Sequence, residues 1–372
     1  MTNTATPAPS DALLTLGDFT IPAGCRRIFV TAQLEPSNGD PRIQPTGFSD
    51  LGPVLYPDPS GREGLICLIE SEASMANRLE EICMKDKYTG TLKDAFAKLP
   101  YLRAQTGTGD AAVLKTTSTL DGHRFASDFL AKGKAKFTPD AEDTLAGHIK
   151  MKLGMANDGK TMPIGRVPDI FPLVLSLDAM SLIHGFQISN EHISFVGLRL
   201  PRALSASLLG FGCERVSVPG IKFNVGQVES ESGQAIFQKP RITAKRIEAR
   251  FSIDVGLLAS LRLVASTEPA ITPDLAPARL QLLLSIALWK VASFLDLLNV
   301  ELSLRTECKL RLKRNLADKG NSTTIQPNFV CEGAEQTFGD FPFASIAKAN
   351  LSEKINAANL PRDRCPLTLQ FS

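Results

Sequence analysis

The sequence has few of the residues and spacings on which common enzyme and metal sites are built. Neither an H-E-x-x-H helix motif nor a G-x-S-x-G nucleophile elbow occurs in its 372 residues. The segment 118–128 holds serine, histidine and aspartate side chains, but the members of a catalytic triad come together from separate elements. We therefore expect no catalytic residue, no metal site and no cofactor. The histidines are His123, His148, His184 and His192.

Cysteine pairs are also absent. The seven cysteines are scattered, their number is odd, and no C-x-x-C pair occurs, which argues against a disulfide framework and a zinc knuckle. Free thiols in a reducing compartment explain this pattern, so we expect a cytoplasmic protein. The cysteines are Cys25, Cys67, Cys83, Cys213, Cys308, Cys331 and Cys365.

No signal peptide, membrane span or long linker is evident. The first residues, MTNTATPAPSDALL, lack a basic segment followed by an apolar core, so we expect a short disordered start. The longest apolar run, Leu280–Val300, is interrupted by Gln281, Lys290 and Asp296, which is typical of a soluble amphipathic helix. The length of the whole chain is compatible with one elaborated domain or with two fused domains, and we take residues 1–372 as a single domain.

The net charge is close to zero but is segregated along the chain. Lys+Arg 41 against Asp+Glu 39 gives +2, so a polyanion would have to be bound by local patches. Residues 239–319 contain 14 basic and 8 acidic side chains, a local +6, whereas residues 1–100 contain 9 and 13, a local −4. Basic patches are therefore available despite the balanced total.

Hydrophobic periodicity predicts an order of strand, helix, strand, strand, helix, strand. The predicted strands are 26–34, 191–200, 242–255 and 301–313, and the predicted helices are 71–84 and 277–299. This order is that of an α+β fold with a ferredoxin-like βαββαβ core of the RNA-recognition type. Long insertions would occupy residues 85–190 and 203–240.

The outer faces of the predicted sheet are basic instead of aromatic. The last strand carries Lys309 and Arg311 on one side, and the strand before it carries Arg246 and Arg250. Because no RNP-type aromatic motif is present, base stacking on the sheet is not expected and contact with a nucleic-acid backbone is favoured. We regard His123 and Arg124 as a structural or RNA-contacting pair instead of a catalytic one.

One segment matches a nucleotide-binding motif letter for letter. Gly154–Thr161, GMANDGKT, fits G-x-x-x-x-G-K-[ST], and LVLSLD beyond it could be a strand that ends at a magnesium-binding Asp178. A phosphate loop opens a helix, but Pro163 and Pro168 follow here and disfavour one. The alternating HIKMKL and the Asn-Asp-Gly after it predict a β-hairpin instead, a basic finger. Its basic residues are Lys150, Lys152, Lys160 and Arg166.

Several segments together resemble a known family. RIQPTGFSDLGPVLY, CLIESEASMANRLE, STLDGHRFAS, SLIHGF, LRLPRALSAS and ALWKVASFLDLLNVELSLRTEC occur in this order between about residues 42 and 312. They are similar to the repeated backbone subunit, of the RAMP superfamily, in the CRISPR type I-G (formerly I-U) Cascade effector complex. The first two segments are the most specific, and the later ones alone would be weak.

This resemblance implies a hand-shaped protein with an RNA-recognition-type palm, finger insertions and a thumb hairpin. Its partners would be guide crRNA, target DNA paired in the R-loop, copies of itself in a helical filament, and the large and crRNA-processing or capping subunits of Cascade, with no membrane. The rigid loop 39–52 and the helix after it would lie along the RNA, and Arg199 and Arg202 would clamp phosphate or a neighbouring subunit. The RNA-binding candidates are Arg42, Gln44, Thr46, Gly47, Phe48, Ser74, Asn77, Arg78, His123, Arg124, Lys160, Arg166, Arg199, Arg202, Lys309 and Arg311.

Two alternatives remain at this point. Related backbone subunits of RNA-targeting CRISPR complexes cut RNA with a loop aspartate, and Asp40 or Asp50 could hold a metal for such chemistry. A nucleotide-hydrolysing switch would depend on Gly154–Thr161 alone.

Overall fold

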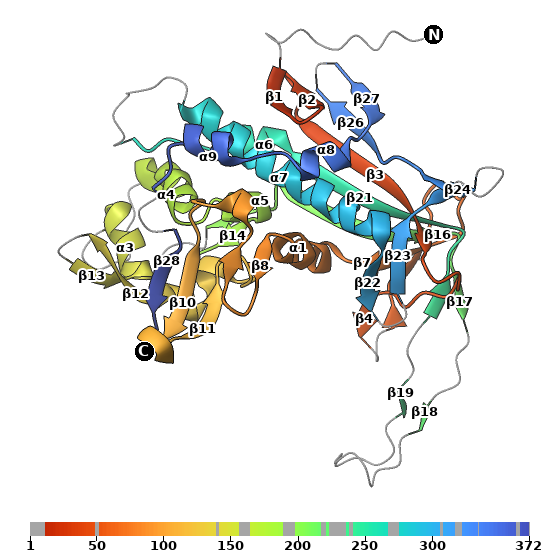
Figure 1. Ribbon diagram of the computed structural model, residues 1–372, viewed down its shortest axis with the longest axis horizontal. Coiled ribbons are helices and arrows are strands. Elements are labelled where there is room, and N and C mark those ends of the chain that lie inside the picture. Colours follow the sequence, from red (N-terminus) through yellow and green to blue (C-terminus); the bar gives the residue numbers. More distant parts are fainter. Residues whose placement is uncertain are drawn as a thin grey trace.

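The computed structural model describes residues 12–48, 52–138, 141–155, 164–188, 198–216, 221–222, 236–237, 241–266, 275–305, 308–316, 322–333, 335–361 and 365–371. Within these ranges the chain forms a large antiparallel sheet with two helices on one face, and a smaller sheet with short helices beside it (Figure 1). The mixture of helices and antiparallel sheets confirms the predicted α+β class.

The large sheet joins segments from nearly the whole chain. Its strands lie in the order β22 (Leu302–Arg305), β23 (Cys308–Leu312), β3 (Arg27–Pro36), β21 (Arg246–Asp254), β16 (Leu204–Phe211), β7 (Leu65–Glu70) and β6 (Leu55–Pro57). β26 (Asn328–Glu332) pairs with β3 and with β27 (Thr337–Asp340). β21 pairs along nearly its full length with both β3 and β16, so that Ile253 lies opposite Ile28 on β3 and Leu204 on β16.

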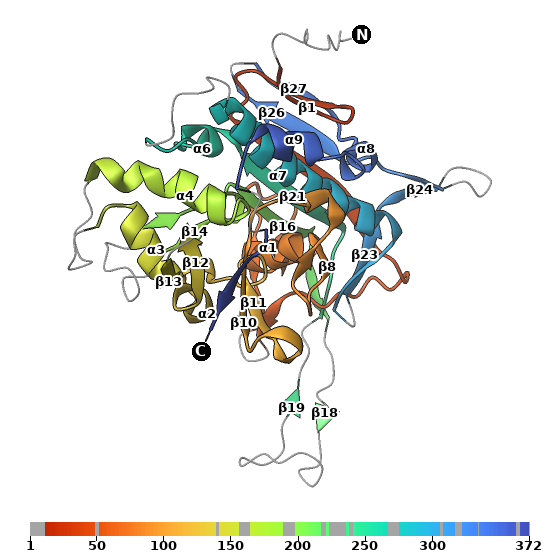
Figure 2. The same ribbon diagram turned by 60° about the vertical axis from the view of Figure 1, so that its left-hand side comes forward.

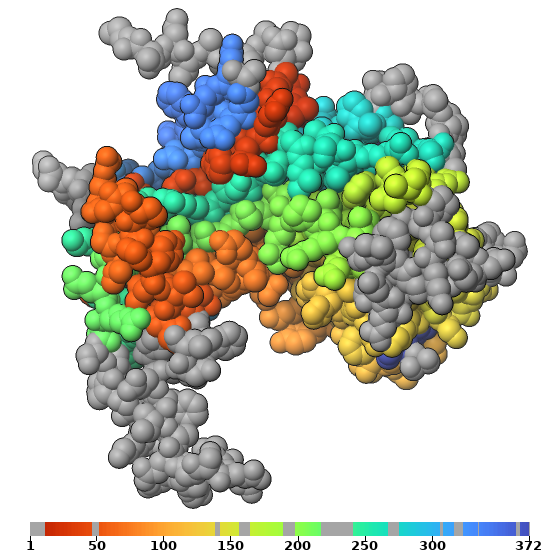
Figure 3. Space-filling view, turned by 180° about the vertical axis from the view of Figure 1, so that it is seen from behind, coloured from red at the N-terminus to blue at the C-terminus, as the bar shows by residue number. Residues whose placement is uncertain are grey.

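The central strands alternate between a buried and a more exposed face, as their sequence predicts. On β3 the buried row is Ile28, Val30, Ala32 and Leu34. This row faces α1 (Glu72–Glu81) and α7 (Leu275–Val300), which pack against the sheet and against each other. The opposite face is seen from behind in Figure 3, where β3, β21 and β16 form adjacent red, teal and green bands.

Helix α1 confirms its predicted start and its buried stripe. Ser71 caps it, because its hydroxyl accepts a hydrogen bond from the amide of Ser74 at 3.3 Å. Met75 and Leu79 are fully buried against the sheet, and Ile82 is the C-cap. The helix therefore begins where capping indicates, but it ends at Glu81, before the predicted end at residue 84, because Met84 begins the next strand.

Helix α7 differs from its prediction in environment, not in position. On the polar side, Ser285 and Lys290 are buried at 0% exposure because short helices and loops cover much of that side too, whereas Asp296 is exposed. Trp289 is 5% exposed and stacks edge-on against Phe96, with ring centroids 4.8 Å apart. Its ring therefore packs inside the fold over the short helical turn that carries Phe96. By length and composition α7 could cross a membrane, but 72% of its most apolar 18-residue stretch is buried inside the fold.

Three strand predictions need correction. The second strand of the core was placed at 191–200, but β15 (Arg199–Leu200) pairs only with β14 (Phe186–Gln187), and the sheet contains β16 instead. Residues 191–197 lie outside the described ranges. The segment 203–240 is thus not wholly an insertion. Strand β7 was not predicted, and 301–313 is a hairpin of β22 and β23, because a run of alternating residues does not reveal where a chain reverses.

The predicted insertion 85–190 contains most of a second sheet. Its order is β11 (Val113–Thr117), β10 (Leu102–Thr106), β28 (Leu367–Gln370), β12 (Lys134–Thr138) and β13 (Ala141–Thr144). The C-terminal β28 runs parallel to β10, so segments far apart in sequence close this sheet (Figure 1). Around it lie α2 (Asp128–Ala131), α3 (Leu145–Lys152), α4 (Ile170–Leu177) and α5 (Ser181–His184).

The predicted basic β-hairpin is wrong in its first half. HIKMKL belongs to α3, which Thr144 caps by accepting a hydrogen bond from the amide of Gly147 at 3.0 Å. LVLSLD lies in α4 and the residue after it, so Asp178 does not end a strand. The alternation of a six-residue segment fits either element, and here a good N-cap and burial of His148 and Ile149 favour the helix.

Short paired strands and helices complete the structure. The pairs are β1 (Ala12–Leu16) with β2 (Phe19–Pro22), β4 (Gly47–Phe48) with β5 (Gly52–Pro53), β8 (Met84–Asp86) with β9 (Thr91–Leu92), β17 (Glu214–Val216) with β20 (Arg241–Thr243), β18 (Ile221–Lys222) with β19 (Ile236–Phe237), and β24 (Arg314–Leu316) with β25 (Ser322–Thr324). The helices are α6 (Val255–Ser260), α8 (Phe343–Ala347) and α9 (Ser352–Ala357). The β18–β19 pair lies well away from the body of the molecule (Figure 2).

Candidate nucleic-acid interface

A groove of about 530 Å³ opens where α1, the turn before α2, and the β14–β15 pair meet. His123, Arg199 and Arg202 line it, so three of the predicted RNA-binding residues from two distant segments come together. Glu72, at the first turn of α1, lies on the same wall, and His184 contributes from the end of α5.

The backbone at Gly185 makes this arrangement possible. Gly185 has φ +78, and a Cβ there would lie 2.5 Å from the carbonyl oxygen of Leu200. Only glycine combines this φ with such a close approach of the chain leading into β14 to the chain leaving β15. The Pro201 bend that follows β15 then presents Arg202 at the groove.

Arg199 and Arg202 bring positive charge to this groove. Arg199, Arg202 and His123 are exposed, and their side chains make no ion pair or hydrogen bond to any residue in the described ranges. Most of the other predicted arginines do have ion-pair partners. The groove therefore presents two arginines that have no ion-pair partner in the described fold, with Glu72 as the acid on its wall.

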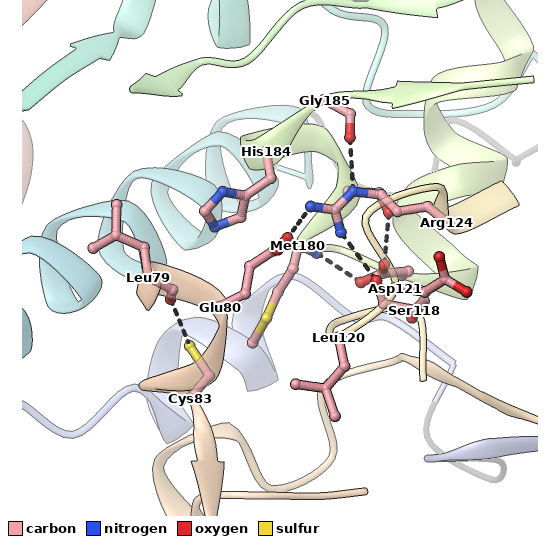
Figure 4. A network of polar contacts seen from close by, with 12 residues as sticks. Leu79, Glu80, Cys83, Ser118, Leu120, Asp121, Arg124, Met180, His184 and Gly185 are labelled. Carbon is pink, nitrogen blue, oxygen red and sulfur yellow. Dashed lines mark hydrogen bonds and ion pairs between the residues drawn. The ribbon is translucent and has the colours of Figure 1, made fainter. Parts of the chain in front are cut away.

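Arg124 lies behind the groove and has a structural role. It is 4% exposed, and its guanidinium pairs with Glu80 of α1 and donates to the carbonyl oxygens of Gly185 and Ser118 at 2.8 and 3.0 Å (Figure 4). Its pKa is lowered, chiefly by burial. This residue joins α1, the 118–124 turn and α5. His123 and Arg124 were predicted to be either structural or RNA-contacting, and Arg124 is structural.

Below the groove lies a buried histidine–lysine pair. Nζ of Lys290 is 2.8 Å from Nε2 of His184, and their exposures are 0% and 3%. Burial, together with the cations Lys290, Arg124 and Arg202, lowers the pKa of His184 well below 6.5. Burial also lowers the pKa of Lys290 and raises that of the nearby Cys83 thiol. Nδ1 of His184 is buried and has no hydrogen-bond partner among the described residues.

The predicted loop 39–52 is held by a local ion pair and by hydrogen bonds to other elements. Arg42 forms a bidentate ion pair with Asp40, 2.6 Å at the shortest, and this hydrogen bonding lowers the pKa of Asp40 to about 2. The carbonyl oxygen of Gln44 accepts from Arg305, and the amide of Thr46 donates to Ile69. Gly47–Phe48 form β4, and residues 49–51 lie outside the described ranges.

On α1, the predicted residues divide between surface and interior contacts. Asn77 is exposed and Ser74 is half-buried. Arg78 instead pairs with the fully buried Glu70 at 2.9 Å and donates to the carbonyl oxygen of Leu304 at 3.0 Å. Arg305 reaches the same Glu70 oxygen at 2.7 Å. Arg78 therefore fastens α1 to β7 and β22.

The helix-free face of the large sheet carries charges that are largely paired. Arg311 forms an ion pair with Glu35 at 2.9 Å, while Lys309 is 4.0 Å from Glu301. Arg246 and Arg250 both pair with Glu248 and lie over the ring of Phe211. This mixture of acids and bases explains why the predicted basic face is less positive than its strands suggest.

The last two predicted RNA-binding residues, Lys160 and Arg166, belong to the segment that was predicted to form a basic finger. Lys160 is outside the described ranges. Arg166 lies in a 3-10 helix, Ile164–Asp169, and donates to the buried Asp169 at 3.1 Å, which Arg262 also contacts at 3.2 Å.

With this geometry in view, comparison with known proteins identifies the family. A family described as CRISPR-associated protein GSU0053 matches residues 28–215, just over half of the chain. This chain belongs to that CRISPR-associated family. As such a protein it works with crRNA and other CRISPR-associated proteins. No curated protein matches the sequence.

The matched segment of this CRISPR-associated protein runs from β3 to β17 and includes every groove residue named above. Sequence reasoning missed His184 and Lys290, which belong to separate helices. A signal existed for Lys290, since a lysine inside the most apolar run of a chain needs a partner if it is buried. His184 had none, because its partner lies 106 residues away.

Proposed function

We propose that this CRISPR-associated protein is a guide-RNA-binding backbone subunit of a type I-G (formerly I-U) Cascade. It polymerises along crRNA, binds the RNA backbone, and presents the spacer for pairing with target DNA in antiviral defence. The observation that carries this proposal is the groove in which Arg199, Arg202 and His123 are exposed and have no ion-pair or hydrogen-bond partner in the described fold. Such side chains attract and position phosphates.

The strand order supports an RNA-recognition-type palm. In chain order β3, β16, β21 and β23 are the first to fourth strands of a βαββαβ unit, and they lie in the sheet as fourth, first, third, second. α1 follows β3 and α7 follows β21, and both pack on one face. β7 and β6 add to the edge beside β16, so the unit is an extended version of the RNA-recognition type of fold.

In this proposal, the segments outside the palm form the fingers and the thumb. The sheet of residues 102–144 with β28 would form the fingers. The β17–β20 pair, continued by β18–β19 away from the body, would be the thumb, whose reach suits contact with a neighbouring copy and with RNA (Figure 1). Other Cascade subunits, the large one and the crRNA-processing or capping one, would contact the ends of the filament, in the cytoplasm and without a membrane.

In this proposal the subunit has no catalytic residue. The alternative, an RNA-cleaving subunit with a metal on Asp40 or Asp50, would require Asp40 to exchange its bidentate contact with Arg42 for a metal. Incubating the assembled complex with complementary RNA and Mg²⁺ tests this directly, and regularly spaced cuts that disappear in the Asp40→Asn or Asp50→Asn variant would establish the alternative.

The central experiment is gentle purification followed by mass and nucleic-acid analysis. A large particle with RNA of one defined length supports the proposal, whereas a monomer without nucleic acid contradicts it. Competition between guides with the same repeat and scrambled spacers should then show less than about a tenfold preference, or 1.4 kcal/mol, because a filament that contacts phosphate and ribose reads no bases.

A further inference from the structure

We propose that His184, Arg199 and Arg202 form a site for one phosphate group, in which Nδ1–H of His184 donates to a phosphate oxygen and Lys290 fixes this tautomer from below. That the phosphate comes from an RNA phosphodiester rests on the proposed function. The phosphate site itself does not. No other described groove on this chain combines unneutralised arginines with a buried donor that lacks an acceptor.

The charge balance under the groove indicates that Lys290 is an ammonium ion. The buried acids of this cluster are Glu80, which pairs with Arg124, and Asp178, whose charge acts on both Arg124 and Lys290; both acids are at most 3% exposed. Two carboxylates against one guanidinium would leave an uncompensated buried negative charge, which is costly. A protonated Lys290 brings the cluster to neutrality, with the Cys83 thiol and the His184 imidazole both neutral.

The hydrogen bond between the pair then decides where the histidine proton lies. An ammonium group has only donors, so across the 2.8 Å contact Nζ of Lys290 donates and Nε2 of His184 must accept. The imidazole proton of His184 is therefore on Nδ1. That nitrogen is buried without an acceptor in the described fold, although the side chain lines the groove.

The ligand that fits must accept hydrogen bonds and carry negative charge. Arg199 and Arg202 contribute two positive charges at the rim against one from Glu72, so the groove has a surplus of one positive charge. A phosphate group offers acceptors only, suits the planar donors of arginine, and satisfies the orphan N–H. A neutral ligand would leave the surplus charge uncompensated.

The histidine tautomer can be observed directly. With four histidines in the chain, long-range ¹H–¹⁵N spectra of ¹⁵N-histidine-labelled protein resolve each imidazole, and His184→Asn and His148→Gln assign the two buried ones. We expect His184 as the neutral Nδ1–H form at neutral pH, and its signal should shift when inorganic phosphate is added while that of His148 does not. An Nε2–H form, or no shift with phosphate, overturns the proposal.

A pair of substitutions tests the donor itself. The side-chain amide of His184→Asn places a donor near the Nδ1 position, whereas that of His184→Gln places it near Nε2. We expect the asparagine variant to keep phosphate binding within a few-fold of the parent and the glutamine variant to lose about tenfold, or 1.4 kcal/mol. Equal affinities in the two variants contradict the assigned donor. If either variant folds poorly, the histidine tautomer measured in the unchanged protein decides the question.

The pH profile separates a binding role from a structural one. The groups that face His184 are Lys290 from α7, Arg124 from the turn before α2, Arg202 after β15, and, through Lys290, Cys83 and Asp178. Because the pKa of His184 is held well below 6.5, its imidazole stays neutral through this range, so phosphate affinity should be flat from about pH 6 to pH 8 apart from ionisation of phosphate itself. A rise in affinity that follows protonation of His184 overturns the neutral Nδ1–H donor.

Finally, RNA is added in place of inorganic phosphate. If RNA shifts the His184 signal in the same direction, the phosphodiester is the ligand. If phosphate shifts it and RNA does not bind, the site stands and the proposed function fails. If RNA binds without moving His184, the proposed function stands and this site is wrong.

Discussion

The guanidinium of Arg124 and the carboxylate of Glu80 form an ion pair in which the two side chains are 5% and 4% exposed. It lies directly behind the groove and connects α1 to the turn that presents His123. Removing one partner of a buried pair leaves an uncompensated charge, at a cost of about 3–5 kcal/mol.

We therefore expect Arg124→Met to lower the free energy of unfolding by about 3–5 kcal/mol, measured by urea denaturation. Glu80→Gln in the same chain should recover part of this loss, because it removes the unpaired carboxylate. Additive effects of the two substitutions would show that the pair has no energetic coupling.

Replacing both groove arginines should reduce RNA binding without affecting stability. Arg199→Ala with Arg202→Ala removes two exposed charges that have no partner in the described fold, so we expect RNA retention to fall at least about tenfold at physiological salt. The matched control, Arg26→Ala with Lys348→Ala, removes the same charge from exposed positions outside the groove. If both double variants lose RNA retention equally, the loss is caused by the change in net charge and not by the groove.

Arg42 and Arg78 should behave differently, although both are predicted phosphate ligands. Arg78→Ala leaves the buried Glu70 with one cation instead of two, and we expect a loss of about 1–3 kcal/mol in the free energy of unfolding. Arg42→Ala breaks an exposed pair and should change stability by less than about 1 kcal/mol. If RNA content falls in Arg42→Ala with stability unchanged, the loop contacts RNA; unchanged content removes it from the interface.

Stability should decline in mild acid because of His184. Its pKa in the folded protein is below the ordinary value of 6.5, so below that pH the unfolded chain takes up a proton that the folded chain does not. The free energy of unfolding should therefore decrease as pH falls through about 6.5, by at most about 1.4 kcal/mol per pH unit for one proton. His184→Asn should flatten this dependence in urea titrations at several pH values, and exposed His123→Asn should not.

The salt dependence of RNA binding tests the open face of the sheet. Arg311 is occupied by Glu35, whereas Lys309 is only 4.0 Å from Glu301 and 44% exposed. If the RNA backbone contacts this face, Lys309→Ala should lower the slope of log K against log salt by roughly 0.7 to 1 unit, and Arg311→Ala should lower it less. An unchanged slope in both would show that the face is only solvated.

The amino-acid sequence alone determined those features whose causes are local. Ser71 and the period of Met75 and Leu79 define α1, because an N-cap and an apolar stripe act within a few residues. Alternation along β3 and β21 reveals two central strands in the same way. The segments that resemble a CRISPR family likewise indicated a CRISPR-associated protein, which the family match over residues 28–215 confirms.

Tertiary structure decided which charged residues are available. Arg78, Arg124 and Arg199 look alike in sequence, but the first two meet buried carboxylates, and Arg199 meets none in the described fold. The partners of Arg124 lie 44 and 61 residues away, and that of His184 lies 106 residues away. Because burial and pairing depend on contacts between distant segments, no local pattern could separate the arginines that hold the fold together from those that face the groove.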